Sequence, residues 1–161
     1  MKKPHFNLLL SCAHLDLIYA QVNVLSSNNS ESDYLNDVWV IPCNPNDYDV
    51  VGAFEELQTL EWKQSTNIKP GDTVYIYVSG QLGSLMYKTR TISTDHYGIG
   101  EIDDRKFHKN FKEEEMRYMV LHLEEKYAES QYPYADLKEH GLNTVQGPSR
   151  MTKNLKAYLE S

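Results

Sequence analysis

Residues 73–79 read TVYIYVS and place two tyrosine rings and a serine hydroxyl on one side of an alternating segment. Tyr75, Tyr77 and Ser79 alternate with valine and isoleucine, which is the period of a β-strand. A surface of aromatic rings with a hydroxyl beside them can bind a flat partner, because the rings stack on its face. The chain has 12 tyrosines. Tyrosine is also frequent in stable sheets, so a purely structural role for this face stays open.

Catalytic and metal-binding patterns are weaker. No Ser-His-Asp order, nucleophile elbow, GxGxxG or Walker loop appears in the sequence. The histidines are too scattered to indicate a metal site. The two cysteines, Cys12 and Cys43, form no disulfide framework and favour reduced thiols in a cytoplasmic protein. We therefore expect a cytoplasmic protein that is not an enzyme, has no cofactor and no metal, and does not enter a membrane.

The charge is unevenly distributed along the chain. The formal net charge is −7, with a balance of −7 over residues 1–62, +3 over residues 63–112 and −3 over residues 113–161. The positive segment contains the tyrosine strand. A local basic face on an acidic body can hold a phosphate backbone.

The elements that position these residues follow from periodicity and turn signals. Residues 26–33, SSNNSESD, are a polar linker, so residues 1–36 are interpreted as an N-terminal appendage and residues 37–161 as one domain. Val50, Phe54, Leu57 and Leu60 have helical spacing, with Asp47 or Asp49 as a candidate N-cap. We predict strands at 37–44, 73–79, 85–93 and 116–128, and helices at 47–62, 133–142 and near the C-terminus after residue 148.

This order predicts an α+β fold, a mixed β-barrel of five or six strands surrounded by helices. The segments VWVIPCNPNDYDVVGAFEELQTLEW and IKPGDTVYIYVSGQLGSLMYKTRTIS resemble the EVE domain, a member of the PUA-like superfamily related to the YTH and ASCH domains. The resemblance covers roughly residues 37–127. Its features are a Trp-bearing strand ending in Asn-Pro, a helix ending in Trp, a Pro-Gly-Asp turn and a Tyr-x-Tyr-x-Ser strand.

The resemblance implies a pocket that accepts one nucleobase, often a methylated one. By position it implies Trp62, Asn44 and Ser79 as base-binding residues. The relatives complete an aromatic cage with a further Trp, and the only other Trp here is Trp39. A tyrosine would otherwise complete the cage, and the candidates are Tyr48, Tyr77, Tyr97 and Tyr118.

A base taken out of its stack needs an aromatic face to replace its neighbours, and polar groups on a rigid frame to read its edge. We therefore expect a nucleic-acid-binding module that recognises a single modified base in an aromatic-lined pocket, in DNA or RNA, with a homodimer left open. The basic residues expected to meet phosphates are Lys63, Lys69, Lys88, Arg90, Arg105, Lys106, Lys109 and Lys112.

Each of these residues also has a structural interpretation. Trp39, among valines and an isoleucine, fits a core position, while Asn44 before Pro45 fits a turn. Two other functions stay open. One is an ASCH-like amidohydrolase acting on a modified nucleoside through the Lys and Thr of residues 87–91, YKTRT, with Glu101. The other is a protein-interaction module that uses the terminal helix.

Overall fold

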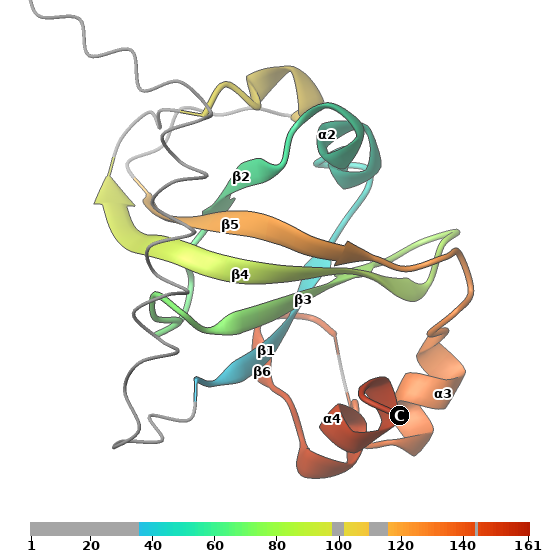
Figure 1. Cartoon of the computed structure of the whole chain (residues 1–161). Helices are drawn as coiled ribbons and strands as arrows, with labels where there is room; N and C mark the ends of the chain where they lie inside the picture. The colour runs from blue at the N-terminus through green and yellow to red at the C-terminus, as the bar shows by residue number, and fades with distance from the viewer. Residues whose placement is uncertain (1–35, 98–101, 110–115, 144) are drawn as a thin grey trace, which may run out of the picture. The chain divides into compact units, whose positions relative to one another are not determined.

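Six strands form one mixed sheet in the part of the chain that the structure describes, residues 36–97, 102–109, 116–143 and 145–161 of a computed structural model (Figure 1). The strands are β1 (Val38–Cys43), β2 (Thr59–Lys63), β3 (Thr73–Val78), β4 (Ser84–Tyr97), β5 (Arg117–Lys126) and β6 (Ser149–Arg150). The helices are α2 (Val50–Glu56), α3 (Tyr134–Glu139), α4 (Lys153–Leu159) and the short 3₁₀ helix η1 (Arg105–Phe107).

The strand order across the sheet is β2-β5-β4-β3-β1-β6. β1 and β3 are parallel, and every other neighbouring pair is antiparallel. The predicted α+β class and the mixed sheet of six strands are confirmed. The sheet is nevertheless open, because within the described residues its outer strands β2 and β6 do not pair with each other, so the expected barrel does not close.

One predicted helix is too long. The helix expected to end at Trp62 ends at Glu56, and Leu57 already has extended backbone angles. Leu60 and Trp62 belong to β2, where they pair with Leu121 and Met119 of β5. The apolar residues at 57 and 60 fit helical spacing by coincidence, while β5 supplies the hydrogen-bonding partner that favours a strand. β6 has two residues and carries no periodic signal.

The sheet separates two clusters of buried side chains. On the face covered by α2 lie the even-numbered residues of β3 with Phe54, Leu60 and Leu121. On the other face, Tyr75 and Tyr77 pack with Leu137 of α3 and Leu155 of α4. Figure 1 shows α2 on one side of the sheet and α3 and α4 on the other. β3 is buried along its whole length because both of its faces are covered.

The buried carboxylate of Asp72 fixes the start of β1 against the start of β3. Its two oxygens accept hydrogen bonds from the backbone N–H groups of Asp37 and Lys69, at 3.0 and 2.9 Å, and from the indole Nε1–H of Trp39, at 3.0 Å. Asp72 is 3% exposed. The turn before it depends on Gly71, whose φ of 92° is unfavourable for residues with a side chain. The Pro-Gly-Asp sequence therefore aligns the two parallel strands.

We expect Asp72→Asn to lower the free energy of unfolding by about 2–4 kcal/mol, because an amide cannot accept all three hydrogen bonds and leaves buried donors unsatisfied. Urea unfolding measured by circular dichroism tests this. Asp103→Asn, which makes the same change at an exposed position, is the control and should leave the unfolding midpoint in place. Equal midpoints for Asp72→Asn and the wild type would contradict the role of this carboxylate.

Candidate functional site

The tyrosine face of β3 is directed at the C-terminal helices. The ring of Tyr77 lies 6.0 Å from that of Tyr134 in an edge-on arrangement, and the ring of Tyr75 lies 6.4 Å from that of Tyr127 in a stacked one. Trp62 packs with the other cluster, on the α2 side of the sheet. The structure therefore does not bring Tyr77 and Trp62 together, and the tyrosine alternation serves packing.

The two polar residues expected to read a base edge make local hydrogen bonds. Asn44 is exposed, and its side chain donates to Asp47 Oδ2 at 2.8 Å and accepts from the backbone N–H of Asn46 at 3.1 Å. Ser79 Oγ donates to the backbone carbonyl of Cys43 at 3.1 Å. Both side chains stabilise the ends of β1 and β3, which is the turn role that these residue types often have.

Trp39 lies in the core. Its side chain is 6% exposed, its indole nitrogen donates to Asp72, and the guanidinium of Arg150 lies over its ring at 5.1 Å from the centroid. This indole is engaged on its edge and on one face. Trp39 therefore occupies the core position that its apolar neighbours indicated, and Trp62 packs against the same buried cluster.

Trp62, Tyr48 and His108 form a cluster of rings on the α2 side. Trp62 is half-buried in β2, and the ring of Tyr48 meets it edge-on, with 5.5 Å between centroids and 85° between planes. The rings of Tyr48 and His108 are 4.5 Å apart. Tyr48 and His108 pair as an isolated antiparallel bridge, which brings the loop after β1 next to the end of η1. The predicted pair of Trp62 and Tyr48 is therefore in contact.

A buried carboxylate lies behind these rings. Asp104 is 5% exposed; its Oδ2 accepts a hydrogen bond from the Tyr48 hydroxyl at 3.0 Å, and its Oδ1 lies 3.6 Å from His108 Nε2. Burial raises the pKa of the Asp104 carboxyl, against the opposite influence of the Tyr48 hydroxyl and His108. Burial and the adjacent Asp104 also raise the pKa of Tyr48.

The basic residues expected to meet phosphates divide into two groups. Arg90, Arg105 and Lys106 are held in ion pairs with Glu124, Asp103 and Glu56. Lys63 and Lys69 are exposed, and Lys88 is half-buried; within the described ranges no ion pair engages these three. Lys109 donates to the backbone carbonyl of Pro45 at 2.7 Å, and Lys112 lies outside the described residues.

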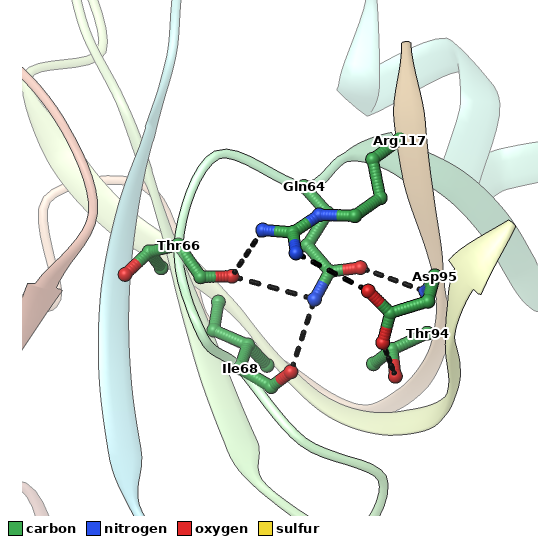
Figure 2. Close-up of polar contacts among 6 residues, drawn as sticks. All are labelled: Gln64, Thr66, Ile68, Thr94, Asp95 and Arg117. Atoms are coloured by element: carbon green, nitrogen blue, oxygen red, sulfur yellow. Dashed lines mark hydrogen bonds and ion pairs between the residues drawn. The ribbon is translucent and has the colours of Figure 1, made fainter. Parts of the chain in front are cut away.

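Gln64 anchors the loop that follows Trp62 and Lys63 (Figure 2). Its amide nitrogen donates to the carbonyls of Ile68 and Thr66, at 3.1 and 3.3 Å, and its oxygen accepts from the backbone N–H of Asp95 at 2.9 Å. Arg117 joins the same group by donating to Asp95 Oδ1 at 3.2 Å and to Thr66 O at 3.3 Å. These hydrogen bonds connect the end of β2 to the irregular end of β4, where Asp95 has a φ of 62°.

Sequence reasoning missed Gln64, Asp104, His108 and Arg117 as members of a site. None of them belongs to a motif, and the contacts that join them to other segments are distant in sequence, 56 positions for Tyr48 and Asp104 and 31 for Gln64 and Asp95. A weak signal was available, because two aspartates at 103–104 precede a basic segment without helical or strand periodicity.

The residues of the alternative enzymatic interpretation are only partly described. The Thr89 hydroxyl donates to the backbone carbonyl of Val74 at 2.8 Å, and the Thr91 hydroxyl is buried without a hydrogen-bond partner among the described residues. Glu101 lies outside the described residues. No group of three or more His, Cys, Asp or Glu residues in the described ranges is placed to hold a metal ion. None of the helices described there has the length and apolar composition needed to cross a bilayer.

Comparison with known proteins relates the chain to the ASCH domain by structure alone. No protein-family model and no curated protein matches the sequence. The ASCH protein from Zymomonas mobilis has 12% identity and a TM-score of 0.52, with 77% of this chain and 94% of that chain covered. A point mutant of that protein gives the same identity and TM-score over 78% and 97%. Rpa0253 from Rhodopseudomonas palustris has 11% identity and a TM-score of 0.50, over 76% and 89%. The chain therefore shares its fold with these ASCH proteins.

We expect Gln64→Leu to lower the free energy of unfolding by about 2–3 kcal/mol, because the near-isosteric apolar side chain removes the partner of the Ile68 carbonyl and of the Asp95 N–H and leaves the Thr66 carbonyl with Arg117 alone. Urea titration measures the loss. Gln81→Leu, the same change at an exposed position, is the matched control. If both variants unfold at the same urea concentration, the Gln64 hydrogen bonds do not hold the loop.

Proposed function

We propose that residues 36–161 form a nucleic-acid-binding module that takes a single, modified base onto Trp62. The observation that carries the proposal is the half-buried indole of Trp62 on the outer strand β2, with the Tyr48 ring perpendicular to it. The Tyr48 ring is 7% exposed and supports the indole from behind, so the exposed part of Trp62 is the surface on which a planar base can stack. This arrangement lies in a fold shared with ASCH domains, the relatives of the EVE domain that the motif order resembles.

The free energy of stacking on one aromatic ring is comparable to the cost of removing a base from its stack. Removing a base from its stack costs a few kcal/mol in a duplex and less in a single strand. Stacking on a protein ring returns about 1–3 kcal/mol per base. A single-stranded target is therefore favoured, because one indole can offset its smaller unstacking cost. A methyl group adds apolar surface that the Tyr48 side of the site can contact.

Lys63 and Lys69 are the side chains best placed to meet the phosphates on either side of such a base. Lys63 ends the outer strand β2 directly after Trp62, with its side chain on the opposite face of the strand, and Lys69 lies in the loop that Gln64 anchors. Both are exposed, whereas Arg90, Arg105 and Lys106 are already paired with carboxylates. The net charge of −7 keeps non-specific attraction to phosphate low, so the base contact must supply much of the affinity.

We expect Trp62→Ala to weaken the binding of short single-stranded DNA and RNA that carry 5-methylcytosine or N6-methyladenine by about tenfold or more, since the stacking surface is lost. Fluorescence anisotropy with modified and plain strands measures the affinity. Gln81→Ala, at an exposed position between β3 and β4, is the control.

Three outcomes of this titration are informative. Tighter binding of modified strands that Trp62→Ala abolishes supports the proposal. Equal affinity for modified and plain strands would remove the modified-base claim. An unchanged affinity in Trp62→Ala would remove Trp62 from the site.

We expect Lys63→Ala and Lys69→Ala each to reduce the slope of log affinity against log salt by about 0.7, the value for one phosphate contact on a single strand. Lys153→Ala, on the exposed surface of α4, should leave the slope unchanged. Equal slopes in all three variants would place the phosphates elsewhere on the domain.

A further inference from the structure

The ring cluster on the α2 side has a buried carboxylate next to it, which plays no part in the stacking of a base on Trp62. Tyr48 contacts Trp62 with its ring and Asp104 with its hydroxyl. A base stacked on Trp62 therefore lies one side chain away from a buried carboxylate. His108 closes the cluster on the other side of Tyr48.

The charge of Asp104 is only partly compensated by its neighbours. The Tyr48 hydroxyl gives it one hydrogen bond of ordinary length, but the contact to His108 Nε2, at 3.6 Å, is longer than a normal hydrogen bond. These contacts lower the pKa of the Asp104 carboxyl without offsetting the effect of burial, which raises it. A carboxylate whose charged form is disfavoured by burial is stabilised by a further positive charge that comes near it.

The other basic side chains of this segment have partners of their own. Arg105 is paired with the exposed carboxylate of Asp103, and Lys106 of the same 3₁₀ helix is paired with Glu56 of α2. Lys109 donates to the backbone carbonyl of Pro45. The cluster thus combines faces of aromatic rings, which attract cations, with a partly compensated anion.

We propose that the Trp62 site prefers a base that carries a positive charge because a methyl group occupies one of its ring nitrogens. 1-Methyladenine and 3-methylcytosine are such bases, since both are cationic near neutral pH. N6-methyladenine and 5-methylcytosine carry the methyl group on the exocyclic nitrogen and on a ring carbon and stay neutral, so each cationic base differs from its counterpart by the methyl position and one bound proton. The inference rests on the proposed base-binding function and specifies the class of base that the site takes.

Two terms favour the cationic base over the neutral one. The charged ring is attracted to the face of Trp62 more strongly than a neutral ring of the same area. The Asp104 carboxylate attracts it through a region of low dielectric, where charges interact more strongly than in water. Each pair has the same ring system and one added methyl group, so charge and the position of the methyl group are what distinguish the two bases.

The test compares short single-stranded RNA oligonucleotides that differ only at one central base. The wild-type full chain is titrated with the 1-methyladenine strand and its N6-methyladenine counterpart, and then with the 3-methylcytosine strand and its 5-methylcytosine counterpart. We expect about tenfold tighter binding of the cationic base in both pairs. Tighter binding in both pairs supports a charge effect, because the methyl positions of adenine and cytosine differ.

Asp104→Asn and Asp103→Asn provide the matched variants. Both remove one negative charge from neighbouring positions, but Asp104 is buried behind Tyr48, whereas Asp103 is exposed. Asparagine at position 104 can still accept the hydrogen bond of the Tyr48 hydroxyl. We expect Asp104→Asn to reduce the preference for the cationic bases severalfold and Asp103→Asn to retain it. A thermal unfolding scan of each variant verifies that it is folded before titration.

The outcomes separate this inference from the proposed function. If the wild type binds both bases of each pair equally well, the preference for a cationic base is overturned and base recognition stands. If no modified strand binds, the proposed function fails and this inference with it. If the preference persists unchanged in a folded Asp104→Asn, the carboxylate is not its source and the inference is overturned. Since the comparison within each pair uses the wild-type chain, the test does not depend on the stability of a variant.

Discussion

The three hydrogen bonds accepted by the Asp72 carboxylate hold the centre of the sheet together. β1 and β3 are parallel neighbours, and parallel strands cannot be aligned by a tight hairpin. Asp72 performs that alignment by binding the backbone just before β1 and the indole of Trp39 within it. Once the register of β1 and β3 is fixed, the antiparallel partners β4, β5 and β2 follow along one side, and Trp62 reaches its place near the loop after β1.

The parallel pair also determines which face each side chain occupies. Because alternate residues of a strand point to opposite faces, the register sends Val74, Ile76 and Val78 to the α2 side and Tyr75 and Tyr77 to the side of α3 and α4. The C-terminal helices cover the tyrosines, with Gly141 at the end of α3 allowing the chain to turn at a φ of 105°. The other face is covered by α2 and by the loops around Tyr48 and His108, and the half-buried Trp62 lies there.

The candidate site is therefore assembled by contacts between segments that are far apart in the sequence. Tyr48, Trp62, Asp104 and His108 come from the loop after β1, from β2 and from the two ends of η1. The bridge between Tyr48 and His108 and the hydrogen bond between Tyr48 and Asp104 join these segments. The rigidity of the candidate site depends on these few polar contacts. The hydrogen bonds of Gln64 hold the neighbouring loop in the same way.

The sequence by itself determined most of the local structure and the class of fold. The hairpin of β3 and β4, the strands β1 and β5, the turn at Gly71 and the two C-terminal helices follow from alternation, turn residues and helical spacing, which are properties of neighbouring residues. Only the tertiary structure decided that Trp62 lies in a strand, because β5 competes there with a short apolar repeat of helical spacing. Only the tertiary structure separated Tyr77 from Trp62 and placed Asp104 behind Tyr48. The physical reason is the same in each case: strand pairing and burial depend on partners that are distant along the chain, and local patterns carry no information about them.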